Sequence, residues 1–316
     1  MKLALIETAD KANKEIQIRI KNLIERDGFT QKQIADKIEV SQTMLSLYLK
    51  NEYAGDITGL EDKLLKLLED NKAEKVYKKV KLDFVKTTVS AKLFNIAQIC
   101  QFNGEIALCT GSSGLGKTTS INQYAKEHSG VIIIDPDEGV SVRELLSYFA
   151  LPLKLELAHI ETRAHLCERI VQKLINSNKL IIVDESENLD VSCFRVLRKI
   201  HDRCKGTCGL LFVGTETLAD KLSKLGGEYD YLFTRFSYID SLDVLTQSDV
   251  KSFVTQIFPD CSDELINEFN FISRCNARIL FNLLKRTADM TTSSKEPLNK
   301  KMIKSAGKYV GAAKHV

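Results

Sequence analysis

A short apolar run, a glycine-rich loop and a helical pattern follow one another between residues 105 and 127. The run predicts a buried strand over Ile106–Thr110, and the loop reads Gly-Ser-Ser-Gly-Leu-Gly-Lys-Thr-Thr. Glycines let backbone N–H groups turn toward phosphate oxygens without obstruction by a Cβ atom. The positive N-terminal end of the following helix favours the same anions. This order predicts an α/β fold and a binding site for a nucleoside triphosphate.

All nine loop residues are predicted to contact the nucleotide: Gly111, Ser112, Ser113, Gly114, Leu115, Gly116, Lys117, Thr118 and Thr119. Lys117 is expected to reach the β- and γ-phosphates, and the Thr118 hydroxyl is expected to bind Mg²⁺.

Strand and helix patterns alternate through the middle of the chain. Further apolar runs stand at 131–135, 180–184 and 210–214, and helical patterns at 141–150, 162–176 and 192–204. Continuous apolar strands between helices indicate a parallel sheet that is covered on both faces. In such sheets phosphates bind at the carboxyl ends of the strands.

Polar residues follow two of these strands. Asp184 is expected to hold the Mg²⁺ shell directly or through water, and Glu185 to orient and deprotonate the attacking water. Thr215 is a candidate contact of the γ-phosphate or of that water. For Thr215, an ordinary threonine at the end of a strand is the alternative.

Two arginines later in the chain are further candidates. Arg235 stands among apolar residues, and a buried arginine needs a counter-charge. A γ-phosphate on a neighbouring subunit would supply it; an ion pair with Asp230 or Asp240 is the alternative. Arg278 begins an amphipathic helix and is expected to reach back to the γ-phosphate, with a surface ion pair as the alternative.

Residues 1–70 are predicted to form an all-helical domain. Helices at 31–38 and 42–50, joined by a tight turn, indicate a helix-turn-helix unit. Gln42, Thr43 and Ser46 are then expected to face the major groove of DNA. A helical bundle that binds protein is the alternative. A lysine-rich linker over 71–90, a nucleotide-binding core over 91–240 and a basic helical subdomain over 241–316 complete the predicted domains.

Composition favours a protein of the cytoplasm. The 316 residues leave room for two or three domains and contain no apolar run of membrane-spanning length. The N-terminal residues do not have the pattern of a signal peptide. The eight cysteines are scattered, which favours reduced thiols, and the spacing of Cys204 and Cys208 is not that of a typical zinc or redox pair.

These motifs, in this order, resemble the AAA+ ATPases. The helix-turn-helix ahead of a single ATPase module, with a short basic helical end, resembles the phage Mu transposition protein B family of transposon target-selection ATPases. The resemblance runs from about residue 16 to residue 310. It implies an AAA+ parallel sheet covered by helices, an N-terminal helix-turn-helix domain and a small C-terminal helical domain.

The resemblance also implies a function. Such proteins use ATP and Mg²⁺ to assemble as helical filaments on double-stranded DNA in the bacterial host cytoplasm, with little sequence preference. They present that DNA to a transposase and stimulate strand transfer, and ATP hydrolysis stimulated by the transposase clears the filament. By motif position, Lys117, Asp184 and Glu185 serve hydrolysis. Thr215 takes the first sensor position, where many relatives have asparagine, Arg235 is the trans-acting finger and Arg278 the second sensor.

Basic residues that face the duplex in such a filament are expected to contact its phosphates. The candidates are Lys154, Arg195, Arg198 and Lys199. Arg195 and Lys199 are four residues apart and share one face of a helix. Two other functions stay open: a helix-turn-helix transcriptional regulator with nucleotide-gated oligomerisation, and a replicative helicase loader.

Overall fold

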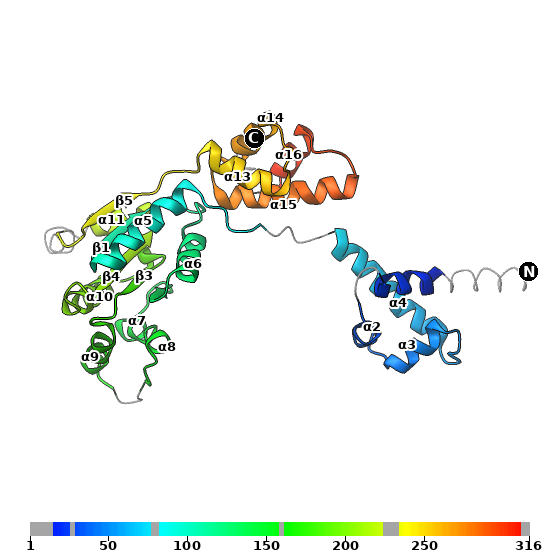
Figure 1. Ribbon diagram of the computed structural model, residues 1–316, viewed down its shortest axis with the longest axis horizontal. Helices are drawn as coiled ribbons and strands as arrows, with labels where there is room; N and C mark the ends of the chain where they lie inside the picture. Colours follow the sequence, from blue (N-terminus) through cyan, green and yellow to red (C-terminus); the bar gives the residue numbers. More distant parts are fainter. Residues whose placement is uncertain (1–14, 26–28, 77–81, 158–160, 224–233, 311–316) are drawn as a thin grey trace, which may run out of the picture. The chain divides into compact units, whose positions relative to one another are not determined.

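The computed structural model describes residues 15–25, 29–76, 82–157, 161–223 and 234–310, with only the backbone for 69–76 and 223. The chain divides into two compact units (Figure 1). One comprises residues 1–79 with 292–295, and the other residues 80–291 with 296–316. The division between residues 79 and 80 falls inside the segment predicted as a linker.

The first unit is helical. It contains a helix over 15–25 and the helices α2 (Gln31–Lys37), α3 (Gln42–Leu49) and α4 (Ile57–Val76). Thr30 caps α2 through a capping box with Gln33, and the Ser41 hydroxyl accepts from the Met44 N–H at the start of α3. These caps stop each helix from running into the next, since they satisfy the backbone N–H groups of a new first turn.

The paired helices α2 and α3 enclose the core of this unit. Ala35 is 1 % exposed, and it lies with Ile34 and Leu45 in that core, as expected for the residue at which two helices touch. Of the residues predicted to face DNA, Gln42 and Thr43 are exposed and Ser46 is half-buried. The helix-turn-helix function of this pair remains a prediction.

The second unit contains the predicted parallel sheet. Its strands are β1 (Ile106–Thr110), β2 (Val131–Ile134), β3 (Lys179–Val183), β4 (Cys208–Gly214) and β5 (Tyr238–Ser241). Their order is β2-β3-β4-β1-β5, and every neighbouring pair is parallel. The sheet confirms the α/β prediction, to which the structure adds β5.

Helices cover both faces of the sheet because its buried strand residues alternate between two cores. Leu180 and Ile182 of β3 pack in one core with the helices α5 (Thr88–Asn103) and α6 (Lys117–Glu127). Ile181 and Val183 pack in the other core, with the helices α7 (Val142–Ser147), α9 (Arg163–Leu174) and α10 (Val191–Arg203). Two short elements, η1 (Ser186–Asn188) and α11 (Glu216–Ser223), follow β3 and β4.

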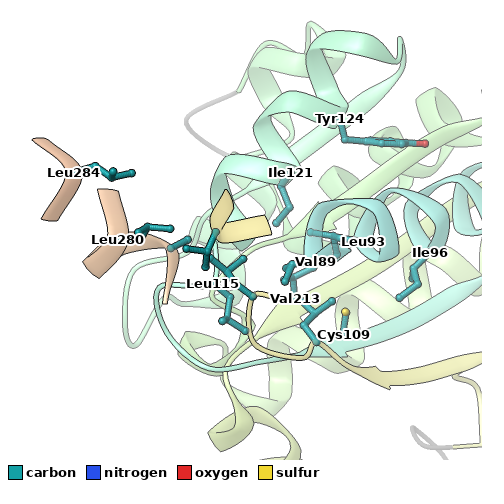
Figure 2. Packing of buried hydrophobic residues seen from close by; sticks show 14 of the residues in the cluster. Val89, Leu93, Ile96, Cys109, Leu115, Ile121, Tyr124, Val213, Leu280 and Leu284 are labelled. Carbon is teal, nitrogen blue, oxygen red and sulfur yellow. The ribbon is translucent and has the colours of Figure 1, made fainter. Parts of the chain in front are cut away.

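A helical subdomain follows β5 (Figure 1). Its helices are α13 (Gln247–Ile257), α14 (Asp263–Ser273), α15 (Ala277–Ser294) and α16 (Lys300–Gly307). Leu280 and Leu284 of α15 belong to the same core as Leu115 of the phosphate loop (Figure 2). The helical subdomain therefore packs directly against the loop.

Two predicted helix boundaries differ from the structure. The helix expected over 141–150 is broken, and α8 (Ala150–Leu153) follows α7 as a separate element. Pro152 explains the break, because proline fits the first turn of a helix but not its interior. The helix α4 continues to Val76, beyond the end at residue 70 that is predicted for the helical domain, through a segment that contains glutamate, lysine and alanine, which favour helix.

Candidate active site

The phosphate loop connects β1 to α6. Gly114 and Gly116 adopt φ angles of 83° and 91°, a left-handed conformation that side chains disfavour. A Cβ atom at Gly116 would meet nothing within 4 Å. Gly116 is also the N-cap of α6, and it offers no side chain to its first N–H groups. Open space beside uncapped N–H groups is the cradle that a phosphate needs.

Leu115 has a different place in the loop from its neighbours. Its side chain is 3 % exposed and packs in the core beside Leu280 (Figure 2). Only the backbone of this predicted nucleotide contact is therefore available to a ligand. The buried side chain anchors the loop between the sheet and α15, which limits how far the neighbouring glycines can move.

The phosphate loop borders a cleft, and Lys117 is one of the residues that line it. Its Nζ donates to the carbonyl oxygens of Gly111 at 2.6 Å and Ser112 at 3.0 Å. Burial lowers the pKa of the Lys117 ammonium, and the carboxylates of Glu187 and Asp184 partly offset that effect. A bound phosphate would offer the Lys117 ammonium charged oxygens in place of the two neutral carbonyl oxygens. The new hydrogen bonds would be stronger, because both partners carry charge.

Asp184 and Thr118 form an oxygen-rich pair at the end of β3. Asp184 is 2 % exposed, and burial raises the pKa of its carboxyl group, against the effect of hydrogen bonds from the Thr118 hydroxyl and the Glu185 N–H. A buried carboxylate beside a hydroxyl suits Mg²⁺, which prefers oxygen ligands and completes its shell with water and substrate phosphates. The residues therefore fit the metal that the phosphate loop implies.

Glu185 follows Asp184 with a φ angle of 44° and an exposed side chain that lines the cleft. Asn188 Nδ2 lies 3.4 Å from its Oε2. Thr215, at the end of β4, is half-buried in the same cleft, and its Oγ1 lies 2.7 Å from Thr217 Oγ1. The structure thus brings together Lys117, Asp184, Glu185 and Thr215, as the predicted catalysis requires.

Two residues at the start of α15 hold the phosphate loop. The Arg278 backbone N–H donates to the Gly114 carbonyl at 3.0 Å, and Asn276 Nδ2 donates to the Ser113 carbonyl at 2.7 Å. Arg278 is among the residues that line the cleft, and its contact with the γ-phosphate stays a prediction. The sequence analysis missed Asn276, although it stands two residues before Arg278, because its partner Ser113 lies 163 residues away.

The far end of the cleft is apolar. The cleft has a volume of 870 Å³, and Phe84, Val85, Phe253 and Phe281 line this part of it. Aromatic and aliphatic side chains suit a planar base. The sequence analysis assigned no contact here, because these residues come from three distant segments that only packing brings together.

Asp249 joins two of those segments. Its carboxylate accepts from the backbone N–H of Thr88 at 2.9 Å and of Thr246 at 2.9 Å, and from both hydroxyls. The pKa of the Asp249 carboxyl group is lowered, because the effect of burial, which would raise it, is smaller than the combined effect of these hydrogen bonds. One carboxylate thus caps both α5 and α13 and links the sheet unit to the helical subdomain.

Arg235 lies outside the cleft. It is exposed rather than buried, so the prediction of a buried arginine was wrong. It borders a small depression with Ile106 and Phe236, and the Ser237 N–H donates to the Ile106 carbonyl at 2.8 Å. Arg235 is therefore at the amino end of β1, opposite the phosphate loop. Asp240, one of the two alternative partners of Arg235, pairs instead with Lys92 at 2.9 Å. The other alternative partner, Asp230, is outside the described residues, as are Leu232 and Phe233.

The candidate DNA contacts of the second unit occupy three places. Arg195 and Lys199 line a groove of 360 Å³ between α9 and α10, together with Arg163 and Arg203. Arg198 faces the depression that holds Arg235. Lys154, at the end of α8, lines a separate hollow with Arg169 and Lys173.

Comparison with known proteins shows what this chain is similar to. Residues 100–222 match the family described as the AAA domain, which covers the phosphate loop and the Asp184-Glu185 pair. Residues 100–222 of this chain are thus similar to an AAA domain. The chain is 28 % identical over 241 residues to the Mu-like prophage FluMu DNA transposition protein B of Haemophilus influenzae, which covers 74 % of this chain and 82 % of that relative. It is 25 % identical to the ATP-dependent target DNA activator B of Escherichia phage Mu, over 92 % of this chain and 94 % of the relative.

Two solved structures are similar to this chain in fold. The chain is similar to Cdc6p of Pyrobaculum aerophilum, with a TM-score of 0.55 and 14 % identity over 75 % of this chain and 71 % of that one. The ORC2 protein of Aeropyrum pernix gives a TM-score of 0.56 and 16 % identity over the same shares. The predicted resemblance to AAA+ proteins and to the transposition B proteins is confirmed.

Two further findings bear on metals and membranes. In the part of the chain that the structure describes, no group of three or more His, Cys, Asp and Glu side chains is placed to hold a metal ion. None of the helices in that part has the length and apolar character needed to cross a membrane. All eight cysteines are free thiols.

Proposed function

We propose that this protein binds double-stranded DNA in an ATP-dependent and largely sequence-independent way, and activates it as a target for transposition. It assembles on the DNA as a helical filament, delivers the DNA to a transposase, stimulates strand transfer and is released by ATP hydrolysis. The observation that carries the proposal is the alignment of 92 % of this chain with the relative named ATP-dependent target DNA activator B. In this chain, Lys117, Asp184 and Glu185 line one cleft, as nucleotide hydrolysis requires.

The cleft supports the hydrolytic part of the proposal. Lys117 and the loop N–H groups bind the phosphates, while Thr118 and Asp184 hold Mg²⁺. The ion, when bound, neutralises charge on the β- and γ-oxygens. Glu185 accepts the proton of the attacking water, since its exposed side chain lines the cleft and is able to turn toward the phosphates.

The sensors connect hydrolysis to assembly. Thr215 and Arg278 line the cleft and report the γ-phosphate to β4 and to the helical subdomain. Arg235 acts on the nucleotide of a neighbouring subunit. Its exposure at the opposite edge of the sheet supports that role, because an arginine outside its own cleft is available to the phosphates of another chain.

The groove between α9 and α10 is the DNA contact that the structure favours. Arg163, Arg195, Lys199 and Arg203 converge there from two helices, and Glu168 pairs with Arg203. The ammonium and guanidinium groups also act on Cys167: burial raises the pKa of its thiol, and Lys199, Arg203 and Arg163 oppose that rise. Four cations around one groove suit a row of backbone phosphates.

Replacing Arg195 and Lys199 together with alanine should weaken DNA binding in a salt-dependent manner. Each phosphate contact contributes about 0.9 to the slope of log affinity against log salt concentration, so the slope should fall by about 2. Fluorescence anisotropy of a labelled duplex across a salt series measures this slope. Arg198→Ala is the matched control, because Arg198 lines the separate depression beside Arg235 and not this groove, and it should leave the slope unchanged. An unchanged slope in the double variant would exclude this groove.

The assembly itself is tested with the purified chain, a long duplex and a slowly hydrolysed ATP analogue. Electron microscopy should show continuous filaments with the analogue and none with ADP or without nucleotide, because the nucleotide joins neighbouring subunits. A single protected site in a footprint would favour the transcriptional regulator instead. Selective binding to a replicative helicase would favour the helicase loader. DNA binding that is the same with and without ATP contradicts the proposal.

A further inference from the structure

Glu187 is an acidic residue of the cleft for which neither the sequence motifs nor the proposed catalysis has a role. It lies in η1, and its half-buried side chain lines the same cleft as Lys117 and Thr215. The Thr215 N–H donates to the Glu187 carboxylate, whose two oxygens both lie 3.2 Å from that nitrogen. The carboxylate therefore occupies the end of β4, between the strands that carry Asp184 and the phosphate loop.

This position is held from two directions. A Cβ atom on Gly214 would lie 2.4 Å from Glu187 Oε2, so the carboxylate packs directly on the strand end. On the other side, Lys221 Nζ donates to the carbonyl oxygens of Glu187 at 3.0 Å and Leu189 at 2.9 Å. Lys221 thus holds the backbone of Glu187, and the Thr215 N–H holds its carboxylate in the cleft.

The charge of Glu187 acts on the group that binds the terminal phosphates. Burial lowers the pKa of Lys117, and Glu187 opposes this more strongly than Asp184 does. The charge of Asp184 is balanced by the Mg²⁺ that it is expected to hold. A γ-phosphate at Lys117 would therefore compete with Glu187 for one ammonium and bring a like charge toward the carboxylate. ADP ends one phosphate earlier and meets less of this repulsion.

We infer that Glu187 determines the preference between ATP and ADP, because its fixed carboxylate opposes the γ-phosphate at Lys117. The inference rests on the proposed nucleotide-dependent function. The carboxylate weakens the binding of ATP relative to that of ADP. The fraction of chains that hold ATP and assemble therefore depends on the ratio of the two nucleotides. Removal of the charge should shift this balance toward ATP.

The test compares Glu187→Gln with the unaltered chain. Glutamine retains an oxygen that accepts the Thr215 N–H, so the strand end keeps its hydrogen bond while the charge is lost. Affinities for ADP and for an ATP analogue with nitrogen between the β- and γ-phosphorus atoms are measured by competition against a fluorescent ADP. Relative to ADP, the variant should bind the analogue about tenfold more tightly, as expected for one screened charge near the surface of a protein. The gain should shrink as salt is added.

Glu144→Gln is the control, because Glu144 is exposed at the start of α7 and glutamine also completes a capping box. It removes one charge of the same sign and should leave the ratio of the two affinities unchanged. An equal change in both affinities for Glu187→Gln would overturn the inference and leave the nucleotide-dependent function intact. A collapse of hydrolysis with an unchanged ratio would also overturn it, and would identify Glu187 as a catalytic base. Failure of the unaltered chain to bind either nucleotide would instead contradict the proposed function.

Discussion

Lys117→Ala is expected to abolish productive ATP binding. The Lys117 ammonium should form charge-assisted hydrogen bonds with two phosphate groups, each worth about 1.5–3 kcal/mol. Their loss lowers nucleotide affinity by about two to four powers of ten. Isothermal titration with ATP measures the affinity, and filament formation on DNA should disappear with it.

Lys251→Ala is the matched control for that experiment. Lys251 is exposed on α13 and pairs with Asp263 at 2.9 Å, so its loss should leave ATP affinity unchanged. Thermal unfolding of both variants without nucleotide is measured as well, because the Lys117 ammonium donates to two loop carbonyls and its loss also removes these hydrogen bonds. ATP binding by Lys117→Ala with normal affinity would remove the phosphate loop from the proposed mechanism.

Arg235→Ala should lose hydrolysis in the assembled state while each chain still binds ATP. An arginine supplied to the transition state from a neighbouring subunit is worth about 10³-fold or more in rate. Because Arg235 lies outside the cleft of its own chain, the variant should bind ATP with normal affinity. Phosphate release in the presence of DNA and a cognate transposase measures the loss, and Arg235→Lys should rescue little of it, because lysine lacks the planar fork of arginine.

A mixture of two inactive variants distinguishes action in trans from action in cis. Lys117→Ala lacks a working cleft but keeps its arginine, and Arg235→Ala has the reverse defect. At mixed contacts the arginine of the first variant meets the cleft of the second, so hydrolysis should reappear. Absence of any recovery, although the two variants co-assemble on DNA, would contradict the trans-acting role.

Local signals account for the features that the sequence analysis predicted well. The strand Ile106–Thr110, the phosphate loop and the two helices that begin after Thr30 and Ser41 each depend on neighbouring residues alone. The sequence analysis missed β5, and four exposed or half-buried residues explain why. A strand without an apolar run carries little of the periodic signal from which strands are predicted.

The residues that surround the nucleotide cleft show the limit of local signals. Asn276, Phe253 and Glu187 come from different elements, and their roles arise from contacts with the phosphate loop, the apolar end and Thr215. In the sequence, Asp249 has the pattern of an acidic residue in the first turn of a helix. Its carboxylate also accepts hydrogen bonds from Thr88, which is 161 residues away. Contacts between residues so far apart in the sequence form only where the fold packs a particular helix face against a particular strand.

The order of residues along the chain was enough to predict an α/β unit with a phosphate loop, a candidate metal-binding acid and a resemblance to the AAA+ proteins. Loop conformation and strand burial follow from residues close to one another, and the motif spacing preserves that information. Packing alone placed Arg235 away from its own cleft and brought Glu187 against the end of β4. A side chain acquires such partners only when helices and strands distant in the chain bury their apolar faces together, because that burial sets which surfaces meet.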